Sequence, residues 1–299
     1  MILSQNQAYQ IGPHQLTVVE NLLRVDHRGH AVYRMRQANG QMVVCKIATS
    51  PEAAKQMEHE QAVLTSLADV PGVVRSLGVY PFGEQLALLV EYVNAPHVAR
   101  GRLHVTALSE HRAQTWPVVV ALMTEGTRIL EQAHMRSIIH ADIKLQNFLY
   151  TADEKLYLAD WDHSLVLPAQ PDAHTPAEGT PQFMAPEQVR HERVDARTDI
   201  YSLGVSCLAL LYGARVTPRY LVVGETVTER TTAEIVKALR VNETIKTDLI
   251  PPPQNDVEAA LQTIWRSMIA ANPAERPSAM TAVRAALPMP IDILPKPVV

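Results

Sequence analysis

The stretch from Ile138 to Asp162 carries the residues with the clearest chemical potential. Its polar members are His140, Asp142, Lys144 and Asn147 in one short segment, followed by Asp160 and Asp162. A carboxylate can orient a hydroxyl group and accept its proton, and a lysine can offset developing negative charge. An amide and a further carboxylate can hold a divalent cation. Together these groups favour phosphoryl transfer.

The region before this stretch has the pattern of a small β-sheet. Runs typical of strands lie at 16–23, 31–36, 41–48, 72–80 and 86–93. Asn39-Gly40 separates the second and third runs and predicts a type I′ hairpin, because both central residues of that turn have positive φ. The run at 86–93 is nearly all apolar, so we expect a buried strand there.

One helix is expected within this strand-rich region. Ser50 has the chemistry of an N-cap, and Pro51 suits the first helical position. Met57, Glu60 and Leu64 then recur on one helical face. A carboxylate on an otherwise apolar face needs a partner, because buried carboxylates are rarely unpaired. The alternative for Glu60 is an independent surface charge.

The chain after residue 94 is mainly helical in its periodicity. Helices are expected at 116–135, 199–212 and 257–271, and a strand at 155–159. The irregular segment at 168–186 is long enough to indicate a functional loop. The resulting organisation is an arm at 1–15, a strand-rich unit at 16–93, a helical unit at 94–287 and a proline-rich tail at 288–299.

Composition and charge argue against several classes of protein. The chain has 299 residues, 47% of them hydrophobic, and a net charge of −4, so no nucleic acid or anionic membrane is expected as a partner. Cys45 and Cys207 lie in apolar runs and are expected to be buried thiols rather than a disulfide. The sequence predicts no Sec signal peptide and no membrane span, and we expect a cytoplasmic protein.

In order and spacing, several fragments over residues 16–287 resemble the eukaryotic-type protein kinase family, and more closely its Ser/Thr branch. In the first part of the chain they are Val43-Val44-Cys45-Lys46, similar to the third-strand lysine motif, and Val90-Glu91-Tyr92-Val93, similar to the gatekeeper and hinge. In the second part they are His140–Asn147, which resembles HRDxKxxN, Asp160-Trp161-Asp162 in the place of DFG, Gly179–Glu187, similar to GTPxYMAPE, Asp199–Val205, similar to the helix F anchor, and Asn272–Pro277.

This resemblance implies an α+β, bilobal protein kinase-like fold. Such a fold has a small antiparallel β-sheet lobe with one main helix and a larger, mostly helical lobe. ATP and Mg²⁺ are the implied cofactors. The implied partner is a protein substrate, which includes the kinase itself as a candidate.

The resemblance also implies a role for each polar residue of the site. Asp142 would be the catalytic base and Lys144 would lie near the transferring phosphoryl group. Lys46 would contact the α and β phosphates and would be fixed there by Glu60. Thr180 would contact the catalytic loop.

Further residues are implied to bind the nucleotide or to support the loop. Asn147 and Asp160 would bind magnesium, and the backbone of Glu91 and Val93 would hydrogen-bond adenine. The apolar contacts to adenine would come from Val32 and Val44 above and Leu149 below; ordinary core packing would make the same positions apolar. In the family, the counterpart of Asp199 bonds the loop backbone and that of Arg276 pairs with the APE glutamate, here Glu187. The alternative for Asp199 is a helix N-cap.

The phosphate-covering loop departs most from the family pattern. Val25, His27 and His30 stand where three glycines are expected, with only Gly29 nearby. Glycine allows close approach of the backbone to phosphates, so this loop is expected to grip ATP less well or differently. For His27 and His30 we favour exposed hairpin residues over phosphate ligands. This departure favours a pseudokinase or a slow enzyme.

Other departures concern the metal loop and the control of activity. Asp162 replaces the DFG glycine and is either a solvated loop carboxylate or a third group beside the metal. Trp161 can fill the space of the family's phenylalanine. Ala141 replaces the arginine that anchors an activation-loop phosphate, so Thr175-Pro176 is expected to be only a turn. His140 is expected to have a structural role rather than to act as a base.

The leading hypothesis is therefore a Ser/Thr protein kinase, with a nucleotide-binding or scaffolding pseudokinase as the alternative. The retained polar set favours the enzyme, because a scaffold has no chemical need for it. A small-molecule kinase is opposed by Lys144 and by the GTPxFMAPE-like segment. Gln146 and His97 stand where kinases that prefer basic substrates often carry glutamates, so no strong demand for upstream arginine is expected.

Overall fold

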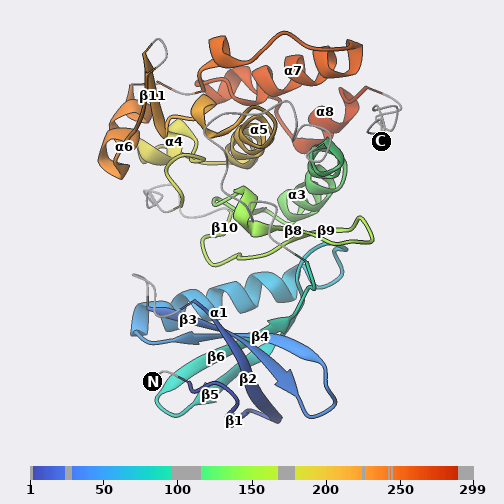
Figure 1. Cartoon of the computed structure of the whole chain (residues 1–299), viewed down its shortest axis with the longest axis vertical. Coiled ribbons are helices and arrows are strands. Elements are labelled where there is room, and N and C mark those ends of the chain that lie inside the picture. The colour runs from blue at the N-terminus through green and yellow to red at the C-terminus, as the bar shows by residue number, and fades with distance from the viewer. Residues whose placement is uncertain are drawn as a thin grey trace. The chain divides into compact units, whose positions relative to one another are not determined.

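The computed structural model describes residues 3–23, 29–95, 116–167, 179–223, 226–241, 243 and 245–288. The chain divides into two compact units, of which the first contains residues up to Asn94 together with Ala159–His163. The second contains Ala95–Leu158 and the residues from Ser164 onward. Strands dominate the first unit and helices the second (Figure 1), so the expected α+β class is confirmed. Val25, His27, His97, Thr175 and residues 289–299 lie outside the described residues.

The first unit is built on a six-stranded antiparallel sheet with the strand order β1-β2-β3-β4-β6-β5 (Figure 1). Its strands are β1 (Ala8–Ile11), β2 (His14–Leu23), β3 (His30–Gln37), β4 (Met42–Ala48), β5 (Ser76–Phe82) and β6 (Gln85–Glu91). Residues 8–11, which fall within the expected N-terminal arm, lie in the sheet, because β1 pairs with β2. Leu3 and Ile11 are buried in the core, and this burial explains why the segment joins the sheet.

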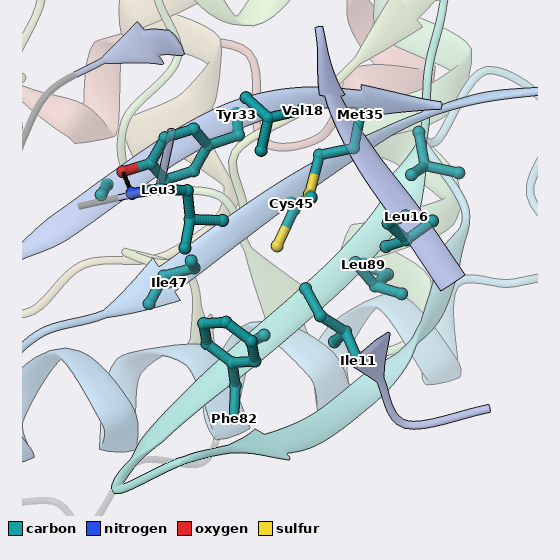
Figure 2. Close-up of a cluster of buried hydrophobic side chains, with 13 residues drawn as sticks. Leu3, Ile11, Leu16, Val18, Tyr33, Met35, Cys45, Ile47, Phe82 and Leu89 are labelled. Atoms are coloured by element: carbon teal, nitrogen blue, oxygen red, sulfur yellow. Dashed lines mark hydrogen bonds between the residues drawn. The ribbon is translucent and has the colours of Figure 1, made fainter. Parts of the chain in front are cut away.

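Side-chain alternation gives the sheet two different faces. One face encloses an apolar core to which Tyr33, Cys45 and Phe82 contribute, and Figure 2 shows their side chains converging. The backbone N–H of Leu3 donates to the Tyr33 hydroxyl at 3.1 Å, which ties the N-terminal residues to this core. Because neighbouring residues point to opposite faces, the second face carries Lys46, paired in register with Val32.

The expected hairpin between β3 and β4 is present, but its turn type differs from the prediction. Gly40 has φ +85°, whereas Asn39 does not have a positive φ. Gly40 N donates to Gln37 O at 2.9 Å, and Gln37 N donates to Gln41 O at 2.8 Å. This three-residue loop with a left-handed glycine matches a type I turn followed by a bulge. Asn39 Oδ1 accepts from Gln41 N at 2.9 Å and so closes the loop with its side chain instead.

The helix of the first unit is α1 (Pro51–Ser66). The Ser50 side chain accepts a hydrogen bond from Ala53 N at 3.1 Å, as an N-cap does. Glu60 lies on the buried face of α1. His30 Nε2 lies 3.3 Å from Ala53 O, and only 6% of this residue is exposed. The expectation that His30 is an exposed hairpin residue is therefore wrong, because its ring packs beside the first turn of α1.

The second unit is mostly helical (Figure 1). Residues 116–121 are helical and continue through a π-helical turn (Leu122–Gly126) into α3 (Thr127–Met135). The other helices are α4 (Pro186–Val189), α5 (Ala196–Tyr212), α6 (Thr232–Arg240), α7 (Asp256–Met268) and α8 (Met280–Ala285), with short 3₁₀ turns at Leu145–Asn147, Ala214–Val216, Thr247–Leu249 and Pro273–Glu275. The paired strands are β7 (Ile138–Ile139) with β10 (Leu165–Val166), β8 (Phe148–Tyr150) with β9 (Leu156–Leu158), and β11 (Tyr220–Val223) with β12 (Thr226–Glu229).

Helix α5 forms the centre of the second unit. Its N-cap is Asp195, whose side chain accepts from Arg197 N at 2.9 Å, so the alternative that Asp199 is the N-cap is wrong. A Cβ at Gly204 would lie 3.0 Å from Ile269 Cγ2 and 3.0 Å from Met268 Cβ. Glycine therefore permits α5 to pack closely against the end of α7.

Both cysteines are buried and unpaired, as expected. Burial raises the pKa of Cys45 to about 12 and also raises that of Cys207, so both are held as neutral thiols. Within the described part of the chain, no helix has the length and apolar character needed to cross a membrane.

Candidate active site

In the first unit, β4 and α1 bring Lys46 and Glu60 together. Lys46 Nζ donates to Glu60 Oε1 at 2.7 Å and to Oε2 at 2.8 Å, and Glu60 is only 3% exposed. The alternative that Glu60 is an independent surface charge is therefore wrong. Burial by itself lowers the pKa of Lys46, but the carboxylates around it together raise that pKa above its usual value. The lysine is thus a fixed positive charge.

A second carboxylate shares this lysine. Lys46 Nζ donates to Asp160 Oδ1 at 2.8 Å, and the Asp160 side chain remains 34% exposed. Asp160 has φ +67°, a left-handed conformation that is uncommon for residues other than glycine. Such strain occurs where the surrounding contacts determine the backbone, and the bond from Lys46 is one of these contacts.

Asp162 lies close to the same charged group and is only 8% exposed. Its negative charge helps to raise the pKa of Lys46. The pKa of Glu60 is also raised, chiefly by burial and in smaller part by the charge of Asp162. Asp162 is therefore not a solvated loop carboxylate, and that alternative is wrong. Trp161 beside it is fully buried.

In the second unit, the polar residues of the loop at 140–147 converge on Asp142. Lys144 Nζ donates to Asp142 Oδ2 at 2.6 Å and to Thr180 Oγ1 at 3.1 Å. Thr180 N donates to Asp142 Oδ1 at 2.9 Å, so both carboxylate oxygens are oriented. Asn147 Nδ2 donates to the backbone oxygen of Asp142 at 2.9 Å. Asp142 itself is 3% exposed, which makes its direction well defined.

Helix α5 anchors this loop through Asp199. Asp199 Oδ2 accepts from His140 N and Oδ1 accepts from Ala141 N, both at 2.9 Å. His134 Nε2 donates to Asp199 Oδ2 at 2.8 Å. Burial opposes ionisation of Asp199, but the bond from His134 and the backbone donors hold its pKa below the usual value. These bonds offset the strain of Ala141, which has φ +63°.

The segment after residue 178 is fitted closely to the loop. A Cβ at Gly179 would lie 3.3 Å from Ala141 O and 3.4 Å from Asp142 Oδ1, and Gly179 has φ +131°. Both the space and the backbone conformation therefore require glycine. Further along, Arg276 donates two hydrogen bonds to Glu187, at 2.7 and 2.8 Å, in a pair that is almost fully buried.

Comparison with known proteins decides the family. The model of the protein kinase domain matches residues 28–287. The chain belongs to the protein kinase family. This kinase is 29% identical to mouse myosin-IIIa over 187 residues, which are 59% of this chain and 12% of the myosin. The resemblance to eukaryotic-type protein kinases is therefore confirmed.

Two relatives named as Ser/Thr-protein kinases point the same way. The kinase is 28% identical to dst1 of Dictyostelium discoideum over 178 residues, which are 59% of this chain and 23% of dst1. It is 27% identical to Aurora-1 of Arabidopsis thaliana over 194 residues, which are 62% of this chain and 61% of Aurora-1. The chain thus spans less than two thirds of the length of these relatives.

The side chains of the kinase suit magnesium and nucleotide chemically. Asn147 uses its amide nitrogen on the loop backbone, which leaves its amide oxygen as the group that can face a cation. Amide and carboxylate oxygens are the ligands that Mg²⁺ prefers. Lys46 carries a partly buried positive charge, a group that suits phosphate oxygens chemically. The described residues contain no group of three or more His, Cys, Asp or Glu side chains arranged to hold a metal ion by themselves.

The expected adenine contacts are distributed over both units. Val32 and Val44 are partly exposed on the sheet face that carries Lys46. Glu91 donates its backbone N–H to Arg75 O at 2.9 Å, and its side chain binds Arg75 as well. Val93 follows β6, and Leu149 pairs with Tyr157 in the β8–β9 hairpin of the second unit. Their roles toward a nucleotide stay predictions.

Two residues that support the site were not identified from the sequence. His134 binds Asp199, and Gln188 donates from Nε2 to Ala141 O at 2.8 Å while its Oε1 accepts from Ala185 N at 3.0 Å. Gln188 is 1% exposed. The only sequence signal for His134 or Gln188 is a polar residue within an apolar pattern, and such a signal does not predict which residue it binds.

Proposed function

We propose that this kinase domain transfers the γ-phosphate of ATP to a serine or threonine hydroxyl of a protein, with Mg²⁺ as the metal cofactor. The observation that carries the proposal is the orientation of Asp142. Both of its oxygens are held in place by donors, Lys144 Nζ at 2.6 Å and Thr180 N at 2.9 Å. Positioning of this kind is the main contribution of a protein to phosphoryl transfer.

In the proposed mechanism, the substrate hydroxyl would donate its proton to Asp142 as its oxygen attacks the γ-phosphorus, while the bond from that phosphorus to the β–γ bridging oxygen breaks and ADP leaves. Lys144, which already lies against Asp142, would offset the negative charge that develops on the transferring group. Lys46 would orient the α and β phosphates, and Glu60 would keep it in place. Asn147 and Asp160 would hold magnesium, which when bound neutralises charge on the phosphate oxygens.

A pseudokinase is the second candidate, and one feature favours it. The glycines that let a backbone approach phosphates are replaced at Val25, His27 and His30, and His30 is turned toward α1 rather than outward. On this alternative, the chain keeps nucleotide affinity through Lys46 but acts as a scaffold.

Transfer of labelled γ-phosphate to a broad protein mixture, and to the kinase itself, tests the proposal. We expect labelling by the wild type and a loss of at least about a hundredfold in Asp142→Ala and Asp160→Ala, since each removes a group that acts in the transition state. Asp153→Ala removes an exposed carboxylate of the second unit and should label like the wild type. Equal labelling by wild type and Asp142→Ala would contradict the proposal. A labelled metabolite without labelled protein would indicate a small-molecule kinase.

A further inference from the structure

The turn that places Thr180 beside Asp142 has a second attachment within the same unit. Gln182 Oε1 accepts a hydrogen bond from Arg219 Nη1 at 3.2 Å. Gln182 is only 7% exposed, so this bond occupies a defined position rather than a free surface. Arg219 directly precedes β11, and the bond therefore joins the β11–β12 hairpin to the turn at 180–184.

The direction of the Arg219 side chain is set by the hairpin itself. Its Nε and Nη2 donate to Glu229 Oε1 at 2.9 and 2.6 Å, and Glu229 is the last residue of β12. The guanidinium carbon lies 5.7 Å from the centre of the Tyr220 ring. Arg230 N donates to Arg219 O at 2.8 Å, which closes the base of the hairpin. A planar guanidinium can bind Glu229 and Gln182 at once, because its donors form a rigid fork.

The turn transmits the position of Gln182 to Thr180. Phe183 N donates to Thr180 O at 2.9 Å, and Met184 N donates to Pro181 O at 3.3 Å. Thr180 in turn donates to Asp142 from its backbone and accepts from Lys144 with its hydroxyl. A shift of Gln182 therefore changes the space next to the catalytic carboxylate, which any acceptor hydroxyl has to enter.

We propose that Arg219 is a positioning residue for the protein substrate. By holding Gln182, it sets the turn at 180–184, and the β11–β12 hairpin thereby determines how an extended substrate segment approaches Asp142. The inference rests on the proposed protein kinase activity. Arg219 acts through the turn and not on the nucleotide, so its loss affects the KM for protein substrate rather than the KM for ATP.

Two variants distinguish the effect of the Arg219–Gln182 hydrogen bond from the effect of the positive charge at position 219. Arg219→Lys keeps the charge and can still pair with Glu229, but it lacks the rigid planar fork that directs Nη1 to Gln182 while Nε and Nη2 bind Glu229. Gln182→Met keeps the length of the side chain and removes the acceptor. We expect each to raise the KM for a peptide substrate about five- to tenfold, as for a lost hydrogen bond to a charged group that is partly exposed. The KM for ATP and the melting temperature should not change.

The two changes should not add, because they remove the same interaction. Gln182→Glu keeps an acceptor toward Arg219 and should have a KM within about twofold of the wild type. The matched control is Arg128→Ala, which removes an ion pair of 2.9 Å to Glu125 with similar exposure and should change neither KM.

Amide hydrogen exchange at residues 180–184 gives a readout that needs no activity. We expect Arg219→Lys and Gln182→Met to speed exchange of Phe183 and Met184, which donate within the turn. Unchanged exchange, or an unchanged peptide KM in an active kinase, would overturn the inference. Equal increases in both KM values, or a lowered melting temperature, would assign a merely structural role and overturn it as well. An inactive wild type with the expected exchange would overturn the proposed function alone.

Discussion

The buried charges of this kinase are distributed so that each of the best-buried ones has a defined counter-charge or donor. Lys46 contacts Glu60 and Asp160, and Arg276 contacts Glu187. Removing one partner of such a pair leaves an uncompensated charge, which costs more than the pair contributes relative to apolar residues. The consequences of mutation at these positions should therefore differ from those at exposed pairs.

The Glu187–Arg276 pair allows this difference to be measured. Arg276→Ala should lower the free energy of unfolding by about 3–5 kcal/mol, because Glu187 is left buried without its cation. Arg190→Ala removes the partly exposed pair with Glu192, at 2.8 Å, and should cost less than about 1 kcal/mol. Urea unfolding of both variants is the measurement. If the two variants lose similar free energies of unfolding, then burial does not determine the cost of breaking an ion pair.

The contacts of Asp199 predict how the free energy of unfolding falls at low pH. Its pKa in the folded protein lies below the ordinary value of 3.8, since the bond from His134 and the backbone donors outweigh burial. The ionised group therefore stabilises the fold at pH values above the unfolded pKa, and this contribution is lost as pH falls through the folded pKa. Between about pH 5 and 3, the wild type should lose stability more steeply than Asp199→Asn. Urea unfolding at fixed pH measures the slopes.

An exposed carboxylate of the same unit provides the control for that slope. Asp248→Asn should leave the pH dependence of the wild type unchanged, because its side chain is exposed. If Asp199→Asn and the wild type show parallel slopes, then the contacts of Asp199 do not favour its charged form.

At the scale of elements, the periodicity of apolar residues and the cap and turn residues predicted where most helices and strands lie. The N-cap at Ser50 and the hairpin between β3 and β4 follow from local chemistry. The turn type was wrong because Asn39 satisfies Gln41 N with its side chain and Gly40 alone takes the left-handed conformation. Residues 8–11 of the expected arm join the sheet, because Leu3 and Ile11 are buried in its core.

Two helical glycines distinguish close packing from helix propensity. Gly204→Ala should destabilise the protein by about 1–3 kcal/mol, because its Cβ would lie 3.0 Å from atoms of Met268 and Ile269. Gly126→Ala has its nearest contact at 3.5 Å, to Leu156 Cδ2, and should be neutral or stabilising by up to about 1 kcal/mol. Thermal unfolding followed by circular dichroism compares the two. An equal loss in both would contradict a specific contact at α5.

At the scale of the whole molecule, the chain forms two compact units that are not two continuous stretches. Ala159–His163 belongs to the first unit although the sequence on either side belongs to the second. Sequence periodicity cannot predict this exchange, because it reports only neighbours within a helical turn or a strand. The contact between Lys46 and Asp160 spans 114 positions and depends on that exchange.

The sequence by itself determined the candidates for chemistry and the class of fold. The motifs that contain Lys46, Asp142, Asn147 and Asp160 resemble those of the protein kinase family in order and spacing, and this resemblance predicted the family. The tertiary structure alone decided which environment each group has. Asp162 and His30 are buried in the folded chain. His134 and Gln188 help to hold the loop at 140–147, and Arg219 binds Gln182. The burial of a side chain and its long-range partners depend on how distant segments pack. Local sequence patterns carry no information about which distant segments come into contact.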